Sequence, residues 1–281
     1  MKFAVCAIIK NENLYLREWV EHYIKLGFDK IILYDNNEKN GELPQLVIQD
    51  YIDAGIVNIY NYRGIIANTF QAFQVNIYNT CIKDYKTKLD WIAFFDIDEF
   101  LYIEHYQTIQ EIFDNMPYNN FDAVVLSWYN IGSDNKLYYE NKPVQERFFT
   151  HNTFNVYGNN SGIIKDLFVK SLVNINSDVN FIDENAHIIN AKKICCVDLN
   201  KLIVLNKSKT FMSYEAKHSI MYIKHYWCKS FTEYMYRRLN QQVFNNFNWT
   251  EYFKNQYVEE WGWNEEHEKV YQDFLKQNNI Q

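Results

Sequence analysis

Three carboxylates follow an apolar segment in the stretch WIAFFDIDEFL, residues 91–101. Asp96 and Asp98 are two positions apart and Glu99 follows directly, and we refer to these three residues as the acidic cluster. If the backbone leaves a strand in a turn at this point, the two aspartates can direct oxygen atoms at one hard cation. Mg²⁺ or Mn²⁺ accepts such oxygens and keeps room for substrate phosphates. The ion would neutralise charge on a departing diphosphate.

The alternative for the acidic cluster is a solvated turn in which Asp98 and Glu99 cap the element that follows. Here apolar and aromatic residues flank the cluster, with residues 91–95 before it and Phe100 and Leu101 after it. Carboxylates in such surroundings carry a desolvation cost unless a cation or hydrogen-bond donors compensate it. The context therefore favours a metal site at Asp96 and Asp98.

The acidic cluster follows one strand of a predicted α/β sheet. Apolar runs predict strands, and apolar residues at helical spacing predict the helices between them. The expected strands are residues 2–9, 30–34, 56–62, 91–95 and 122–129, and the expected helices lie around residues 16–24, 44–54 and 68–84. This alternation predicts a doubly wound, mostly parallel sheet, in which ligands bind outside the carboxyl ends of the strands. The acidic cluster lies at such an end.

The last part of the chain predicts two or three helices. Ser230-x-x-Glu233 and Asn248-x-x-Glu251 are helix-start signals. We expect residues 1–229 to form the α/β domain and residues 230–281 to form a helical extension that packs on the same unit. A role at a membrane surface is the alternative for this Trp- and Tyr-rich end.

Composition and charge exclude several classes of protein. The formal net charge is −7, with 28 Lys and Arg against 35 Asp and Glu and no basic run, which argues against nucleic acid as a partner. The five cysteines lack a C-x-x-C pair, so neither a disulfide framework nor a zinc site is indicated. The sequence shows no signal peptide and no apolar stretch of about 18 residues, and we expect a cytoplasmic protein.

Several motifs recur in the order of a known family. The motif DIDEFL after the segment WIAF, together with Lys10-Asn11-Glu12, Glu18-Trp19 and Leu26-Gly27-Phe28, resembles glycosyltransferase family 92 and related family-2-like bacterial glycosyltransferases of the GT-A fold. Further matching positions are Gln74, Tyr78, Asn79, Cys81, Gly132, Ser133, Glu146, Arg147, Phe148, Lys170, His187, His225, Tyr226, Lys229 and Ser230. The resemblance implies a nucleotide-sugar-dependent transferase in which Asp96 and Asp98 form the metal motif. Ile131 replaces the aromatic residue of the family's F-G-S segment, a departure that concerns acceptor contacts more than the metal site.

Donor recognition in a doubly wound domain is expected in the loops after the first strands. Carboxylate and amide groups there could hold uracil or ribose edges, and a guanidinium could reach a phosphate or a base. The expected donor-binding residues are Lys10, Asn11, Glu12, Asp35, Asn36, Arg63, Gln74 and Lys229. The alternatives are an ordinary polar turn for residues 35–37, an exposed arginine without a role for Arg63, and surface lysines for Lys229 and its neighbour Lys224.

The resemblance also implies a late histidine that joins the aspartates at the metal. His225 in KHYWCKS matches the family's His-Tyr motif and is the first candidate, and His187 is the second. A neutral imidazole is a suitable ligand for Mn²⁺. The alternative for either residue is a hydrogen-bonded core histidine.

Transfer with inversion needs a carboxylate that takes the proton of the acceptor hydroxyl. Glu146 is the first candidate on chain order and family resemblance, and Asp134 and Glu215 are the others. An ion pair of Glu146 with Arg147 or another cation would be a structural explanation of the same residue.

The resemblance implies an inverting glycosyltransferase that uses a UDP-sugar and Mn²⁺ or Mg²⁺ to extend a cell-surface glycan. Lipooligosaccharide and capsule are common acceptors among bacterial relatives, so we expect a glycan acceptor, lipid-linked ones included, and peripheral work at the inner face of the cytoplasmic membrane. One alternative is a sugar- or nucleotide-binding protein of the same fold without turnover. The other is a phosphatase that uses an Asp-x-Asp nucleophile, although that motif usually follows the first strand.

Overall fold

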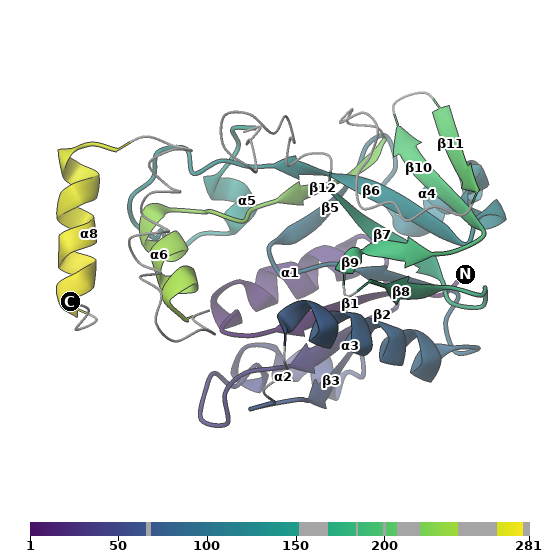
Figure 1. Ribbon diagram of the computed structural model, residues 1–281, viewed down its shortest axis with the longest axis horizontal. Coiled ribbons are helices and arrows are strands. Elements are labelled where there is room, and N and C mark those ends of the chain that lie inside the picture. The colour runs from purple at the N-terminus through teal and green to yellow at the C-terminus, as the bar shows by residue number, and fades with distance from the viewer. Residues whose placement is uncertain are drawn as a thin grey trace. The chain divides into compact units, whose positions relative to one another are not determined.

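The computed structural model describes residues 1–65, 69–151, 168–183, 185–198, 201–206, 220–240 and 263–277 (Figure 1). The strands are β1 (Phe3–Ile9), β2 (Lys30–Asp35), β3 (Val57–Asn61), β4 (Trp91–Phe94), β5 (Glu99–Ile103), β6 (Ala123–Asn130), β7 (Val169–Asn174), β8 (Asn180–Ile182), β9 (Asn185–Asn190), β10 (Lys193–Asp198), β11 (Lys201–Asn206) and β12 (Met221–His225). The helices are α1 (Asn13–Lys25), α2 (Gln45–Asp53), α3 (Phe70–Tyr85), α4 (Ile109–Asn115), α5 (Val144–Arg147), α6 (Phe231–Asn240) and α8 (Glu265–Gln277), and a 3-10 helix spans Pro117–Asn120.

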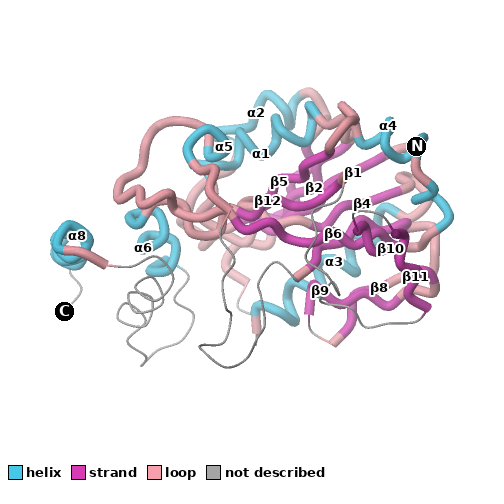
Figure 2. The backbone as a smooth tube through the Cα atoms, turned by 90° about the horizontal axis from the view of Figure 1, so that it is seen from above, coloured by secondary structure: helices cyan, strands magenta, loops and turns pink. Residues whose placement is uncertain are grey.

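The first half of the main sheet is parallel. Strands β3, β2, β1 and β4 lie side by side in that order, and each neighbouring pair runs in the same direction. Figure 2 shows α1 and α2 on one side of these strands and α3 on the other. The expected α/β class and its doubly wound parallel sheet are therefore confirmed.

The central strand β1 is buried along its whole length, because helices cover both faces of the sheet. Its residues Ala4 and Cys6 belong to a buried cluster that includes Ile77 and Cys81 of α3. On the opposite face, the centroid of the Phe3 ring lies 6.4 Å from that of Phe28 and 4.9 Å from that of Phe113. A strand buried on both faces explains why this segment of the sequence is apolar without alternation.

The second half of the sheet contains antiparallel strands. Strand β7 lies between β4 and β6 and is antiparallel to both, and β6 is parallel to β10. Strand β12 pairs with β6 and is antiparallel to β5, which begins within the acidic cluster. A separate hairpin of β8 and β9 contacts α3. These strands bring residues from late in the chain to the carboxyl end of β4.

The chain forms two compact units, which we describe separately. The first comprises residues 1–129 and 155–225, and the second comprises residues 130–154 and 226–281. The second unit contains a segment, residues 130–154, that the sequence analysis placed in the α/β domain. Across the described residues, no helix combines the length and the apolar character needed to span a membrane.

Helix α6 of the second unit begins where the sequence predicts. The backbone N–H of Ser230 donates to Glu233 Oε2 at 3.2 Å, and the N–H of Glu233 donates to Ser230 Oγ at 3.5 Å, which makes the expected reciprocal cap. The other predicted start, Asn248-x-x-Glu251, lies outside the described residues. Apolar residues of α6 and α8 form the core of this unit with residues before α6: Leu137, Trp227, Cys228, Phe231, Tyr234, Met235, Val270, Tyr271 and Phe274.

Candidate functional site

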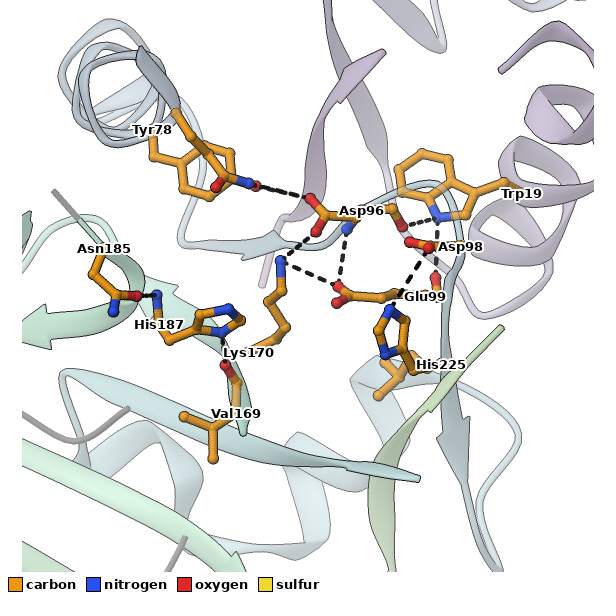
Figure 3. A network of polar contacts seen from close by, with 12 residues as sticks. Trp19, Tyr78, Asp96, Asp98, Glu99, Val169, Lys170, Asn185, His187 and His225 are labelled. Carbon is orange, nitrogen blue, oxygen red and sulfur yellow. Dashed lines mark hydrogen bonds and ion pairs between the residues drawn. The ribbon is translucent and has the colours of Figure 1, made fainter. Parts of the chain in front are cut away.

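The acidic cluster forms a tight turn between β4 and β5 (Figure 3). The backbone N–H of Glu99 donates to the carbonyl of Asp96 at 3.0 Å. In return, the N–H of Asp96 donates to Glu99 Oε2 at 2.9 Å. The chain thus leaves strand β4 in a turn, as a metal site at this position requires.

Helix α1 fixes this turn from one side. The indole Nε1 of Trp19 donates to the carbonyls of Asp96 and Glu99, each at 3.0 Å, and the Tyr23 hydroxyl donates to the same Glu99 carbonyl at 2.9 Å. Trp19 and Tyr23 are four positions apart, so they lie on one face of the helix. Their rings are fully buried, and the main chain of the acidic cluster is therefore held by a rigid part of the core.

The Asp96 carboxylate meets three donors. Gln74 Nε2 and the Tyr78 hydroxyl donate to Oδ1 at 3.2 Å and 3.4 Å, and the Lys170 ammonium lies 2.7 Å from Oδ2. The Asp96 side chain is nevertheless 36% exposed, whereas that of Lys170 is only 2% exposed. Gln74 is one of the predicted donor-binding residues, and the structure places it against the acidic cluster.

Glu99 is the most buried acid of the cluster, with a side-chain exposure of 0%. Its Oε2 atom lies 3.5 Å from the Lys170 ammonium, and its buried Oε1 atom has no hydrogen-bond partner within the described part of the chain. Burial raises the pKa of Glu99 well above its usual value, although Lys170 opposes this shift. Burial alone would lower the pKa of Lys170, but Asp96 and Glu99 outweigh it, and the pKa of Lys170 is raised. The buried ammonium of Lys170 therefore supplies a positive charge beside the acidic cluster.

Asp98 faces the histidine expected at the metal. His225 Nε2 lies 3.6 Å from Asp98 Oδ2, and His225 is paired in register with Glu99 across β12 and β5. The ring of Trp128 lies against the imidazole, with centroids 4.1 Å apart. A separation of 3.6 Å is long for a hydrogen bond. It suits two ligands of one ion, each about 2.1 Å from the metal.

The donor set of this site fits a divalent ion with two protein ligands. Where the structure describes the chain, no group of three or more His, Cys, Asp or Glu residues is placed to hold a metal ion. Asp98 and His225 face each other, whereas Asp96 Oδ2 faces the Lys170 ammonium. Mg²⁺ is commonly held by one or two carboxylates together with substrate phosphates. A substrate diphosphate could therefore complete the coordination.

The second histidine candidate has other contacts. His187 Nδ1 donates to the carbonyl of Val169 at 2.7 Å, and its ring lies 5.2 Å from that of Trp128. Burial, with a smaller contribution from the charge of Lys170, lowers the pKa of His187 to about 4. A neutral imidazole beside Lys170 follows from these contacts.

The loops after β1 and β2 meet at the carboxyl edge of the sheet, as the doubly wound topology predicts. Lys10 forms an ion pair with Glu38 at 2.8 Å, and the N–H of Asn11 donates to Asn37 Oδ1 at 2.8 Å. The N–H of Asn36 donates to the last carbonyl of β1, and its buried Oδ1 has no hydrogen-bond partner among the residues described. The structure therefore brings four of the predicted donor-binding positions, 10, 11, 35 and 36, into one region.

Arg63 holds the loop that follows β2. Its Nη1 atom donates to Asp35 Oδ2 at 2.8 Å and to the carbonyl of Glu42 at 2.7 Å. Its Nη2 atom donates to the carbonyls of Glu38 and Gly41 at 2.8 Å and 3.0 Å. The guanidinium is thus engaged in shaping this edge of the sheet, and a contact with phosphate or base stays a prediction. Asp35, the last residue of β2, shares the same network.

The remaining predicted donor residues lie at turns. Glu12 precedes α1, and its carbonyl accepts hydrogen bonds from the N–H groups of Tyr15 and Leu16. Lys229, in the second unit, is 3% exposed and has a positive φ of 56° just before α6. Lys224, its alternative, lies in the first unit, where its ammonium is 4.4 Å from the ring centroid of Tyr102.

The predicted catalytic bases belong to the second unit or lie outside the described residues. Asp134 accepts hydrogen bonds from the N–H groups of Phe149 and Thr150 at 2.7 Å and 3.1 Å, which closes a loop. Glu146 is exposed on α5. Its neighbour Arg147 forms a buried ion pair with Glu233 at 2.7 Å. Glu215 lies outside the described residues.

Sequence reasoning assigned no role to Lys170 or Glu99. Lys170 appeared only as a position of resemblance, and Glu99 only as a neighbour of the two aspartates and, in the alternative of a solvated turn, as a capping residue. One signal was present, because Lys170 is the single charged residue in the segment VKSLVN, residues 169–174. A lysine in an apolar strand must find a counter-charge when the strand is buried. The sequence does not say which carboxylate supplies it.

Comparison with known proteins identifies a family. The model of glycosyltransferase family 92 matches residues 1–273. A family 92 protein of Oryza sativa subsp. japonica is 26% identical over 111 residues, which cover 40% of this chain and 18% of the relative. A galactan beta-1,4-galactosyltransferase of Arabidopsis thaliana is 28% identical over 109 residues, which cover 37% of this chain and 21% of the relative. The chain thus matches about a fifth of each relative's length.

Solved structures show a weaker likeness. S. aureus TarS is 14% identical with a TM-score of 0.44, and the match covers 92% of this chain and 44% of TarS. TarS 1-349 in complex with UDP-GlcNAc is 13% identical with a TM-score of 0.42, and the match covers 92% of this chain and 73% of the other.

Proposed function

Because the chain belongs to glycosyltransferase family 92, we propose that it transfers a sugar from a nucleotide-sugar donor to a glycan acceptor. The observation that carries this proposal is the 3.6 Å separation of His225 Nε2 and Asp98 Oδ2, which places the imidazole beside the acidic cluster at the carboxyl end of β4. Ligands of doubly wound sheets bind at that end. The family match gives no support to the phosphatase alternative.

The cofactor in this proposal is Mn²⁺ or Mg²⁺. Asp98 and His225 would hold the ion. Asp96, the third predicted ligand, stays a prediction, because its Oδ2 atom faces the Lys170 ammonium. When bound, the ion would neutralise charge that develops on the leaving diphosphate. The protein's own contribution is rigidity, because the indole of Trp19 holds the main chain of the turn and the ring of Trp128 holds the imidazole. Pre-organised ligands need no rearrangement when the charge develops.

The donor in this proposal is a UDP-sugar. The loops after β1, β2 and β3 are tied together by Arg63 and by the hydrogen bond between Asn11 and Asn37. The buried Oδ1 atom of Asn36 is an acceptor that a nucleotide N–H could use, since buried polar atoms are normally paired. Lys10, Glu12, Asp35 and Gln74 complete the proposed donor contacts within the first unit, and a donor contact of Lys229, which belongs to the second unit, stays a prediction.

The chemistry in this proposal is transfer with inversion, which requires a base for the acceptor hydroxyl. Both carboxylate oxygens of Asp134 accept main-chain hydrogen bonds, whereas Glu146 is exposed. Glu146 is therefore the first candidate and Asp134 the second.

The acceptor in this proposal is a glycan. The matched curated relatives are plant proteins and include galactan beta-1,4-galactosyltransferases, which makes UDP-galactose and a galactan oligosaccharide the first pair to test. The resemblance to bacterial enzymes favours lipooligosaccharide, capsule or a lipid-linked acceptor at the inner face of the cytoplasmic membrane.

Release of UDP from UDP-sugars tests the function. The purified protein is incubated with UDP-galactose, UDP-glucose or UDP-GlcNAc, with Mn²⁺, Mg²⁺ or EDTA, and with or without galactan oligosaccharides. Metal-dependent release that is lost in Asp98→Asn and kept in Asp53→Asn, an exposed carboxylate of α2, supports the proposal. Nucleotide binding without release from any donor would identify a non-catalytic binding protein. Absence of both binding and release would overturn the proposal.

A further inference from the structure

Lys170 occupies one side of the acidic cluster. Its ammonium lies 2.7 Å from Asp96 Oδ2 and 3.5 Å from Glu99 Oε2, and the side chain is almost completely buried (Figure 3). The residue comes from β7, which pairs with β4, so the strand register fixes where the ammonium lies. It is thus a permanent cation beside two of the three carboxylates.

A divalent ion and this ammonium compete for the same oxygens. Asp96 Oδ2 and Glu99 Oε2 already face Lys170, and a second cation between them would be repelled at short range. Asp98 Oδ2 faces His225 instead. The cluster is therefore divided into a side held by the protein's own cation and a side that faces an imidazole.

We propose that Lys170 determines where the divalent ion binds, because its ammonium fills the side of the cluster formed by Asp96 and Glu99 and confines the ion to Asp98 and His225. This inference rests on the metal site of the proposed function. Lys170 is in this account a positioning residue, and it acts through the carboxylates that it holds.

The account implies a latent second cation site. Without the ammonium, Asp96 Oδ2 and Glu99 Oε2, which both face Lys170, would lack that counter-charge. Glu99 Oε1 is fully buried and has no hydrogen-bond partner in the described ranges, so the same carboxylate also carries an oxygen atom that a cation could use. Hard divalent cations take such carboxylate oxygens. Neutralising Lys170 should therefore raise the number of bound ions from one to two.

Titration with Mn²⁺ alone tests this inference, with free Mn²⁺ measured by its electron paramagnetic resonance signal. The proteins are the wild type, Lys170→Gln and the charge-preserving control Lys170→Arg, each with His225 intact and with His225→Ala. We expect one ion for the wild type and Lys170→Arg, and two for Lys170→Gln. In the His225→Ala background, Lys170→Gln should bind Mn²⁺ at least 10-fold more tightly than the protein with Lys170. The double variant Lys170→Gln, Glu99→Gln should return to one ion.

The outcomes separate this inference from the proposed metal site. If the wild type binds one ion and Lys170→Gln gains none, Lys170 does not confine the ion, although the metal site stands. If neither protein binds Mn²⁺, both the metal site and the inference are wrong. If Lys170→Gln does not fold in EDTA, Mn²⁺ added during refolding should restore its circular dichroism spectrum. Failure of that rescue while Lys170→Arg folds would also overturn the inference.

Discussion

His225 Nε2 lies 3.6 Å from Asp98 Oδ2, although one residue ends β12 and the other precedes β5. The antiparallel register of these strands pairs His225 with Glu99 and so places the imidazole beside the turn. The Trp128 ring of β6 supports the imidazole from another strand. The geometry of the site therefore depends on strand pairing between distant parts of the chain.

Replacing His225 should weaken metal binding. His225→Ala removes one of two proposed protein ligands, and we expect Mn²⁺ affinity to fall about 100-fold, since even the loss of an outer partner of a ligand costs about 10- to 100-fold. His187→Ala is the matched control, because His187 donates to the Val169 carbonyl and should leave the affinity within about threefold. Calorimetric titration with Mn²⁺ measures both. An equal loss of Mn²⁺ affinity in the two variants would contradict the assignment of His225 as the metal ligand.

Lys170 should stabilise the fold through its carboxylates. In metal-free buffer, Lys170→Met leaves Asp96 and the buried Glu99 without their cation, and we expect the free energy of unfolding to fall by about 3–5 kcal/mol. The double variant Lys170→Met, Glu99→Gln removes a negative charge as well and should lose less than the sum of the single variants. Unfolding in urea gives the free energies of unfolding of the wild type, the two single variants and the double variant. Strict additivity would show that Lys170 and Glu99 do not interact.

The buried pair of Arg147 and Glu233 should stabilise the second unit. The Nη1 and Nη2 atoms of Arg147 donate to the Glu233 carboxylate at 2.7 Å and 2.9 Å, and both side chains are buried. Arg147→Met leaves a buried carboxylate without its cation and should cost about 3–5 kcal/mol. Arg17→Met removes an exposed ion pair and should cause no measurable change. Hydrogen exchange of α6 amides measures the effect, and unchanged protection would contradict it.

His22 should make stability depend on pH. Burial lowers the pKa of His22 to about 4, against about 6.5 in the unfolded chain. The unfolded state therefore binds more protons between these values, and the free energy of unfolding decreases as the pH falls from about 6.5 to 4. His22→Gln can still donate to the Leu101 carbonyl and should reduce this slope by up to about 1.4 kcal/mol per pH unit. Parallel curves for wild type and variant from denaturant unfolding would refute the assignment.

The parallel half of the fold could be predicted because its signals are local. The expected strand 2–9 corresponds to Phe3–Ile9 and the expected strand 91–95 to Trp91–Phe94, since a strand covered on both faces is apolar throughout. Strand β7 gave no such signal. It lies between β4 and β6, and its partners are set by pairing across long stretches of chain.

The candidate site, like the fold, could be predicted only where its signals are local in the sequence. The position of Asp96 and Asp98 after a buried strand was visible in the sequence, whereas the partners of these residues were not. Which atoms Lys170 meets depends on the register of β7 against β4, and no pattern within residues 169–174 encodes that register. The position of His225 beside the acidic cluster could be expected only through family resemblance, because its strand pairs with β5, which lies far earlier in the chain.

Nucleotide binding with and without Mn²⁺ is the most direct test of the central claim that the acidic cluster holds a metal that holds a diphosphate. Calorimetry with UDP, GDP and CMP compares the wild type, Asp98→Asn and the exposed control Asp53→Asn. The account predicts UDP binding that requires both Mn²⁺ and Asp98 and that survives in Asp53→Asn. UDP binding of equal strength in EDTA and in Asp98→Asn, or no nucleotide binding under any condition, would contradict it.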